Sequence, residues 1–177
     1  TFEQSVEVCR DVFYGMDNAY GSIFDRMLEK GHLDVYTKAG KRGSAFMIGA
    51  NGIPTYVFLN YVNNFRWLET IAHEVGHAIH GELSKAQPAI YEDFTLSTAE
   101  TASTLFEQMA TRRLIEILPD SQKVVALHDT LSNSVATIQR QIACFNYMKE
   151  MYEYIGEHGL ATKQELAQMM QKHLKSY

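Results

Sequence analysis

Two histidines and a glutamate lie close together in the segment His73-Glu74-Val75-Gly76-His77, which has the pattern HExxH. On an α-helix, residues four apart share one face, so His73 and His77 can present ring nitrogens to one metal ion. Glu74 would lie beside that ion. The pattern is typical of zinc hydrolases in which the glutamate is the general base, so the segment predicts hydrolytic zinc chemistry.

Catalytic zinc sites have three protein ligands and one position open to water, so a third ligand must come from elsewhere in the chain. His80 is the nearest candidate, but along a helix axis it lies about 10.5 Å from His73, too far for both to bind one ion. We therefore expect His80 either to support a ligand or to pack against a neighbour. The metzincin extension is also absent, because it requires Gly and His where the chain has His80 and Leu83.

Glu100 is a candidate third ligand on a second predicted helix, which runs from about residue 93 to Leu118 and is ended by Pro119. Glu107 follows seven residues later and is therefore on the same face. If this helix packs against the HExxH helix, the set His, His and Glu is one of the known catalytic zinc sets. Ser97-x-x-Glu100 also fits a capping box, in which the carboxylate binds a backbone amide. Spacing alone favours neither interpretation.

The elements that must position these residues are mostly helical. An apolar stripe predicts that the HExxH segment lies on a core-packed helix; its members are Trp67, Leu68, Ile71, Val75, Ala78 and Ile79. Gly76 inside this helix costs about 1 kcal/mol relative to Ala. We expect the close approach of another segment, or of substrate, to explain this glycine.

Two helices are predicted near the start of the chain, over residues 3–13 and 17–30, the second capped by Asp17 and ended by Gly31. Strand-like runs separated by glycine-containing turns follow at residues 35–36, 45–48 and 55–61. They predict a small antiparallel sheet. Two functions are open for this sheet. Its edge pairs with an extended peptide substrate, or its strands form a hairpin that only covers the core.

The rest of the chain also has a helical pattern. Residues 120–157 are apolar at helical spacing, Gly159 ends that helix, and Thr162-x-x-Glu165 is a capping box that begins a last helix. The methionine and tyrosine side chains of the helix over residues 120–157, such as Met148 and Tyr152, are expected to pack in the core rather than to form a cofactor surface. The predicted fold class is mainly α with a small antiparallel β-sheet.

Composition narrows the classes of function. A chain of 177 residues with 46% hydrophobic and 21% charged residues is typical of one soluble globular domain. A net charge of -5, a pI near 5.8 and no stripe of basic residues argue against nucleic-acid binding. No apolar run is long enough to cross a membrane, so no membrane partner is expected. Cys9 and Cys144 fit no CxxC pattern and are interpreted as reduced cysteines of a cytoplasmic protein.

Four blocks of sequence carry a resemblance to a known family. They are residues 34–36 with 40–46, residues 73–80, residues 87–94, and residues 99–104 with Glu107. In this order they resemble the thimet oligopeptidase and oligoendopeptidase F family of zinc peptidases, over roughly residues 17–177. Four ordered blocks are far more specific than the HExxH pattern by itself.

The resemblance implies a site and a substrate class. It implies that His73, His77 and Glu100 bind one zinc ion, that Glu74 activates the metal-bound water, and that Glu107 supports the site. It further implies a zincin-like helical catalytic core with the small sheet at the cleft, and oligopeptides as substrates.

Members of this family continue past the region that matches the end of this chain, with a His- and Tyr-rich segment that closes the cleft. The chain ends at Lys175-Ser176-Tyr177 and begins with Thr1 rather than Met. We therefore expect residues 1–177 to form a single domain that is a fragment of a longer metallopeptidase catalytic domain.

The main functional hypothesis is a zinc-dependent endopeptidase that hydrolyses oligopeptides. The alternative is a catalytically silent zinc-binding helical domain, a truncated or degenerate homologue, because loss of one oxyanion donor alone can lower turnover about 10²- to 10³-fold. A structural HExxH helix without metal is a third interpretation. No oligomeric state is predicted.

Overall fold

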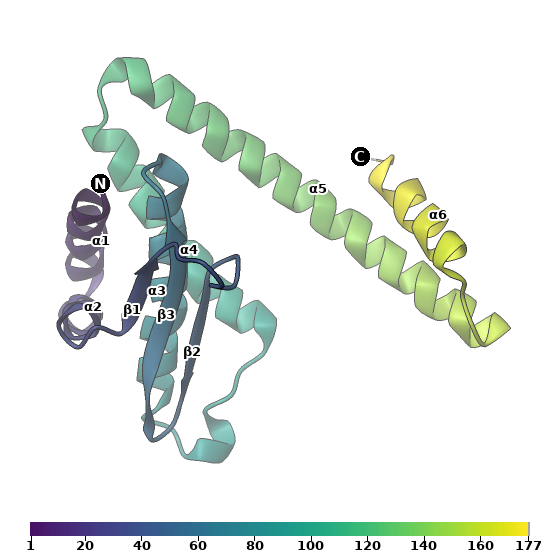
Figure 1. Cartoon of the computed structure of the whole chain (residues 1–177), viewed down its shortest axis with the longest axis horizontal. Coiled ribbons are helices and arrows are strands. Elements are labelled where there is room, and N and C mark those ends of the chain that lie inside the picture. The colour runs from purple at the N-terminus through teal and green to yellow at the C-terminus, as the bar shows by residue number, and fades with distance from the viewer. Residues whose placement is uncertain (177) are drawn as a thin grey trace. The chain divides into compact units, whose positions relative to one another are not determined.

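The computed structural model describes residues 1–176, which group into a first compact unit of residues 1–119 and a second that begins at Asp120 (Figure 1). The first unit contains α1 (Phe2–Met16), α2 (Asn18–Glu29), β1 (Leu33–Tyr36), β2 (Phe46–Ala50), β3 (Ile53–Tyr61), α3 (Phe65–Ser84), the short 3-10 helix η1 (Ala89–Tyr91) and α4 (Leu96–Ile117). The second contains α5 (Asp120–His158) and α6 (Lys163–Leu174). The mainly helical fold with a small sheet is confirmed, and the single domain expected over residues 1–177 stays a prediction.

The first two helices form because their ends are capped and their apolar faces meet. Thr1 and Gln4 form a capping box at the start of α1, and the carboxylate of Asp17 accepts a hydrogen bond of 2.7 Å from the backbone N–H of Ala19 at the start of α2. Phe13 of α1 and Phe24 of α2 are fully buried and meet edge to face, with ring centroids 5.1 Å apart. This contact anchors the helix pair in the core of the first unit.

The sheet has the strand order β1-β3-β2, with β3 in the centre. β2 and β3 are antiparallel and are joined by the predicted Asn51-Gly52 turn, in which Gly52 has a φ of 81° that favours glycine. β1, by contrast, is parallel to β3. The sheet is therefore mixed rather than antiparallel throughout. Residues 37–45 are too long for a tight hairpin, and they let β1 lie on the far side of β3 from β2.

The central strand attaches the sheet to the helices. Thr55, Val57, Leu59 and Tyr61 of β3 are buried, and the residues between them are more exposed, as expected for a strand with one covered face. Both β3 and β2 contact α3 (Figure 1). The sheet thus covers one side of the HExxH helix.

The α3 helix lies in the middle of the first unit and also contacts α1, α2 and α4. Asn64 caps its start by accepting a hydrogen bond of 3.2 Å from the backbone N–H of Trp67. The predicted apolar stripe is buried except for Trp67, which is partly exposed: Leu68, Ile71, Val75, Ala78 and Ile79 are at most 4% exposed. Because this face of α3 is fixed in the core, the helix holds the side chains of the HExxH motif in defined positions.

The second unit is a helical hairpin. Thr162 and Glu165 form the predicted capping box of α6, and Gly159 ends α5 with a φ of 80°. Tyr154 of α5 donates a hydrogen bond to the Glu165 carboxylate, and Lys172 of α6 donates to Glu150 at 2.9 Å. These polar contacts tie α6 to the C-terminal half of α5.

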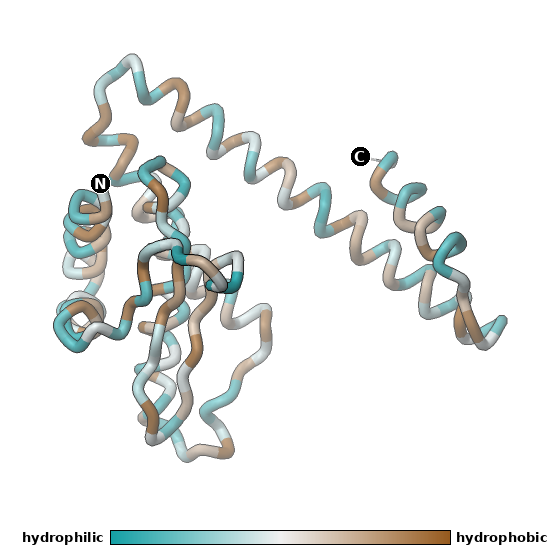
Figure 2. The backbone as a smooth tube through the Cα atoms, in the orientation of Figure 1, coloured by the Kyte–Doolittle hydropathy of each residue, from teal (hydrophilic) through white to brown (hydrophobic). Residues whose placement is uncertain are grey.

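The expected core packing of α5 is wrong for most of its length. Figure 2 shows hydrophobic residues alternating with hydrophilic ones along this helix, yet only Ala126 and Ala143 of it are buried. Phe145, Met148 and Tyr152 are 68%, 46% and 64% exposed. The reason is length: α5 has 39 residues and α6 has 12, so α6 can cover only part of it.

Two smaller predictions concern membranes and cysteines. No helix among residues 1–176 is long and apolar enough to cross a membrane. Cys9 and Cys144 are both free thiols. Burial raises the pKa of the Cys9 thiol to about 12, so this cysteine acts as an apolar core residue.

Candidate metal centre

The two helices that carry the candidate ligands pack closely because α3 has a glycine at their contact. A Cβ atom on Gly76 would lie 3.0 Å from the Cα atom of Ser103 and 2.9 Å from Cδ2 of Phe106, both on α4. The first distance is tighter than nine in ten real Cβ contacts and the second is shorter than such contacts allow, so a larger residue would force α4 to shift. The close approach of another segment, expected from the sequence, is therefore present, and it brings the first turns of α4 beside the HExxH motif.

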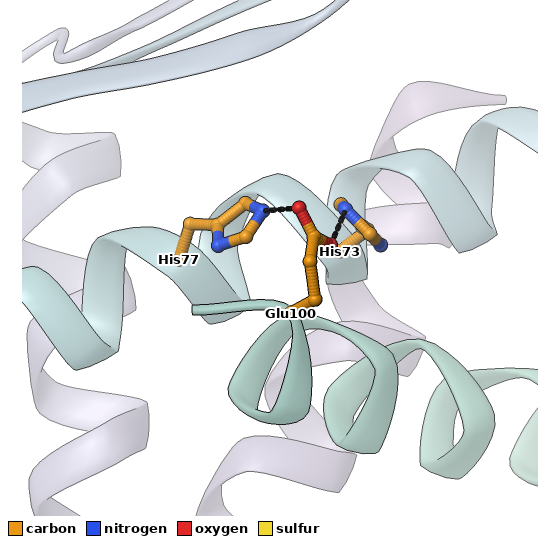
Figure 3. A group of neighbouring side chains, drawn as sticks. All are labelled: His73, His77 and Glu100. Carbon is orange, nitrogen blue, oxygen red and sulfur yellow. Dashed lines mark ion pairs between the residues drawn. The ribbon is translucent and has the colours of Figure 1, made fainter. Parts of the chain in front are cut away.

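At this contact the side chains of His73, His77 and Glu100 converge (Figure 3). One potential ligand atom from each residue lies within 4.8 Å of the others. Oε2 of Glu100 is 3.3 Å from Nε2 of His73, and Oε1 of Glu100 is 3.7 Å from Nε2 of His77. The carboxylate from α4 thus lies between the two imidazoles of α3.

These separations fit a single metal ion. Ligand atoms about 2.0–2.2 Å from a tetrahedral ion are separated from each other by roughly 3.4 Å, close to the two nitrogen–oxygen distances observed. Figure 3 draws the same contacts as ion pairs, which require protonated histidines. The atoms present can therefore form either a metal centre or a charged cluster, and metal binding distinguishes the two.

Glu107 determines which nitrogen of His73 faces the cluster. Nδ1 of His73 is 2.8 Å from Oε2 of Glu107, so in the neutral form of His73 this nitrogen carries the proton and donates a hydrogen bond to the carboxylate, while Nε2 has a lone pair. The hydrogen bond to Glu107 raises the pKa of His73, and burial opposes that shift. Glu107 follows Glu100 by seven residues, about two turns of α4, so both lie on the same face of this helix, as predicted.

His77 has the opposite electrostatic environment. Burial lowers its pKa, and the neighbouring His73 lowers it further. The two rings are nearly perpendicular, with centroids 4.9 Å apart. A neutral His77 therefore offers a lone pair to a cation at neutral pH, which is the form that a metal ligand requires.

A serine orients Glu100 and the capping alternative is wrong. Ser103 is fully buried, and its hydroxyl donates a hydrogen bond of 2.9 Å to Oε2 of Glu100. The residue that caps α4 is Thr95, whose side chain accepts from the backbone N–H of Thr98. Ser97 and Glu100 form no capping box, so the Glu100 carboxylate is available to face the histidines.

Glu74 is buried beside the cluster, with only 8% of its surface exposed. Burial raises its pKa to about 7, the neighbouring His73 lowers it, and Glu100 raises it. A carboxyl group with a pKa near neutrality can both accept and release a proton at physiological pH. This is the property that a general base and acid needs.

His80 packs against a neighbouring aromatic ring and, within residues 1–176, forms no hydrogen bond or ion pair with a candidate ligand. Its ring stacks on Phe94, with centroids 4.0 Å apart and ring planes at 21°. Its buried Nδ1 has no hydrogen-bond partner among the described residues. Burial lowers the pKa of His80, which keeps the stacked ring neutral.

Sequence reasoning missed two contributors to this region. Ser103 lies three residues after Glu100, so helical spacing placed it on the same face, but nothing in the pattern indicated a hydrogen bond to that carboxylate. Phe94 stacks on His80 from the segment before α4, and no spacing rule links these two residues. The Ser103 contact lies within α4, whereas the stacking of Phe94 on His80 depends on how the segment before α4 lies against α3.

A family model and curated relatives that match this chain are all described as peptidases. The family model described as peptidase family M3 matches residues 11–177. The oligopeptidase PepF of Bacillus subtilis is 33% identical over 143 residues, which cover 80% of this chain and 21% of PepF. An oligoendopeptidase F homolog of Borreliella burgdorferi is 29% identical over 182 aligned positions, covering 100% of this chain and 31% of the homolog.

The fold is shared with solved structures. PZ peptidase A, solved with an inhibitor, superposes with a TM-score of 0.76 at 19% identity, covering 96% of this chain and 30% of that one. This similarity shows the fold alone. The chain spans 21% of PepF and 31% of the Borreliella homolog, so these longer proteins contain further sequence beyond the matched region.

Proposed function

Because the chain belongs to peptidase family M3, we propose that it carries the metal centre of a zinc endopeptidase that hydrolyses oligopeptides. The family resemblance read from the four sequence blocks is thereby confirmed. The observation that carries the proposal is the Glu100 carboxylate of α4 between the Nε2 atoms of His73 and His77 on α3. A His, His and Glu set is typical of catalytic zinc in peptidases.

Each residue near the cluster has a role in this proposal. His73, His77 and Glu100 hold the ion, and Glu107 orients His73 through its Nδ1 proton. A bound zinc ion would polarise a peptide carbonyl and lower the pKa of a water molecule toward neutrality. Zinc suits this site because two imidazoles and one carboxylate leave a fourth, tetrahedral position open.

Glu74 moves the proton. Its carboxylate takes a proton from the attacking water and delivers it to the leaving nitrogen of the cleaved peptide bond. The raised pKa of Glu74, about 7, supports this role because the protonated and ionised forms are then close in free energy. Its burial also excludes bulk water as a competing proton acceptor.

The sheet supplies a candidate surface for substrate. β2 is an edge strand, since β3 pairs with only one of its sides, and it contacts α3, the helix that carries His73 and His77. An extended peptide that pairs with this edge would gain main-chain hydrogen bonds with little demand on its side chains. This favours a peptide-binding edge over a hairpin that only covers the core.

Zinc content and turnover test the proposal together. The purified chain is expected to bind one zinc ion and to cleave a quenched fluorescent oligopeptide, with cleavage lost on chelation and restored by zinc. Glu74→Gln should keep the zinc and lose at least about 10²-fold in turnover, since general acid–base catalysis contributes that much. A chain that takes up no added zinc contradicts the proposal.

The same assay distinguishes the silent zinc-binding domain. That alternative concerns the isolated chain, which spans less than a third of these two relatives. Stoichiometric zinc without zinc-dependent cleavage, in a chain indistinguishable from Glu74→Gln, would establish it. We place either form in the cytoplasm, where the two free cysteines would stay reduced.

A further inference from the structure

A cavity of about 250 Å³ lies at the C-terminal end of α3, between that helix, β2 and the segment that leads to α4. Figure 1 shows this segment running alongside β2. Gly81, which lines the cavity, follows His77 by one helical turn, so the cavity begins about 6 Å further along α3 than the metal centre. His73, His77 and Glu100 do not line it. It is a separate feature beside the proposed peptide-binding edge.

The size and walls of the cavity fit one amino-acid side chain. Sites for drug-sized ligands occupy about 300–1,000 Å³, more than this cavity offers. Its apolar lining includes Met47 of β2, Phe94, Ala50 and Ala89, and Gly49 and Gly81 add no side chain to it. A long unbranched side chain can lie along such walls with its end group beyond them.

The charges around the cavity are unbalanced. Lys85, the only basic residue that lines it, uses its three protons on the Ile53 carbonyl, the Thr55 hydroxyl and the Glu82 carboxylate. Its charge is therefore already bound to Glu82, which also accepts a hydrogen bond of 3.1 Å from Arg26. Two further carboxylates, Glu92 and Asp93, also line the cavity.

Neither of these carboxylates has a basic partner among residues 1–176. Oε2 of Glu92 accepts a hydrogen bond of 3.0 Å from the backbone N–H of Asn51, and Oδ1 of Asp93 accepts one of 2.9 Å from the N–H of Phe94. Each carboxylate has a second oxygen with accepting capacity left. The cavity thus combines apolar walls with two carboxylates that form no ion pair with a residue of the described chain.

Resting on the proposed function, we infer that this cavity is a subsite for a basic side chain of the bound peptide. A lysine or arginine would lay its aliphatic stem against Met47 and Phe94 and direct its charged end to Glu92 and Asp93. An uncharged side chain of the same length would gain only the apolar contacts. The peptidase would therefore prefer a basic residue at one fixed position of its substrate.

Binding rather than turnover tests this inference, so it does not depend on catalysis by the isolated chain. The zinc-loaded Glu74→Gln variant is titrated with Nα-acetylated, C-amidated Ala/Ser peptides in which one lysine occupies each position in turn. The matched peptides carry norleucine, which keeps the stem and removes the charge. At one position the lysine peptide should bind about three- to tenfold tighter, the range for one or two partly exposed charge contacts.

Matched substitutions locate the effect. Glu92→Gln and Asp93→Asn keep an acceptor for the Asn51 and Phe94 amides but remove the charge, so the double variant should lose the lysine preference while binding norleucine peptides normally. Glu29→Gln, an exposed carboxylate on α2, should leave the preference unchanged. The NMR amide signals of Gly49 and Gly81 should shift more with the lysine peptide than with its norleucine match.

Four outcomes would overturn the inference. If lysine and norleucine peptides bind equally at every position, or if the double variant keeps the preference, the cavity is no basic subsite although peptide binding stands. If the same peptides without the acetyl cap bind more tightly and lysine then gives no advantage over norleucine, the cavity binds the peptide's N-terminal ammonium group instead. If no peptide binds and the wild-type chain cleaves none, the proposed function itself fails.

Discussion

Glu100 has two carboxylate oxygens, and each faces a different histidine while the Ser103 hydroxyl holds the group in place. Local spacing allowed Glu100 to serve its own helix as a cap, and the structure gives that task to Thr95. The difference matters because a cap contributes to stability and a ligand contributes to metal affinity. Substitution separates the two.

We expect Glu100→Ala to abolish stoichiometric zinc binding with little change in thermal stability, because the side chain is 44% exposed and makes no capping contact. Thr95→Ala should do the opposite, costing about 0.5–2 kcal/mol of stability and leaving zinc in place. Metal analysis after dialysis, combined with thermal unfolding monitored by circular dichroism, measures both. Retained zinc in Glu100→Ala would remove Glu100 from the ligand set.

Glu107→Ala should weaken zinc binding by about 10- to 100-fold, the usual effect of losing a residue that orients a ligating histidine. Without Glu107, the Nδ1 proton of His73 has lost its acceptor and the ring is free to turn. Glu107→Gln should have a smaller effect, because the amide oxygen still accepts that proton. Competition with a zinc-sensitive dye gives the affinities, and equal values for all three proteins would contradict this role.

At the scale of elements, the crossing of α3 and α4 decides whether the ligands meet. Gly76→Ala should destabilise the protein and weaken zinc binding, although alanine is the better helix former by about 1 kcal/mol. The added methyl group would lie 3.0 Å from the Ser103 backbone, so the helices must separate, and overpacking of this kind costs roughly 1–3 kcal/mol.

Gly81→Ala on the same helix is the matched control for Gly76→Ala. Its added methyl group would meet only Cε of Met47 at 3.5 Å, an ordinary contact. This variant should be as stable as the wild type or more stable, by up to about 1 kcal/mol. Urea unfolding of both variants and of the wild type measures the difference, and similar behaviour of the two would contradict the tight helix crossing.

The α5–α6 hairpin should be sensitive to acid through Glu165. The hydrogen bond from Tyr154, followed by those from Thr162, lowers the pKa of Glu165 from 4.5 to about 2. A carboxyl group whose pKa is lower in the folded state stabilises that state above its unfolded pKa, and the contribution is lost as the pH falls. We therefore expect α6 to loosen between about pH 4.5 and pH 2.

Amide hydrogen exchange in α6, followed as the pH is lowered and corrected for intrinsic rates, measures this loosening. Glu165→Gln already lacks the charge, so its protection at pH 6 should be reduced and should change less on acidification than that of the wild type. Some acid response remains, because Lys172 and His173 also lower the pKa of Glu150. Glu153→Gln, which removes an exposed carboxylate on α5 that is 3.9 Å from Lys149, should behave as the wild type. An acid response in Glu165→Gln equal to that of the wild type would contradict the role of Glu165.

At the scale of the whole molecule, the site and the core belong to the first unit. All members of the main hydrophobic cluster lie between Val6 and Leu114, and the three candidate ligands lie in the same unit. A chain that ends at Pro119 is therefore expected to fold and to bind one zinc ion. Zinc analysis together with circular dichroism checks this, and an unfolded product would show that the first unit needs more of the chain.

Much of this arrangement could be predicted from the sequence, because it depends on local rules. The capping residues Asp17 and Thr162, the Asn51-Gly52 turn and the buried stripe of α3 all follow from the chemistry of a few neighbouring residues. The HExxH pattern belongs to this class, since one helix positions both histidines. Two of the three candidate ligands could therefore be identified before the fold was known.

Tertiary structure alone decided the contacts between segments far apart in the chain. The position of Glu100 beside the histidines depends on the crossing of α3 and α4 at Gly76, and the parallel pairing of β1 with β3 depends on the path of the intervening loop. The exposure of Phe145 on α5 depends on how much partner surface α6 provides. Spacing reports which residues share a face, whereas packing between elements determines what each face meets.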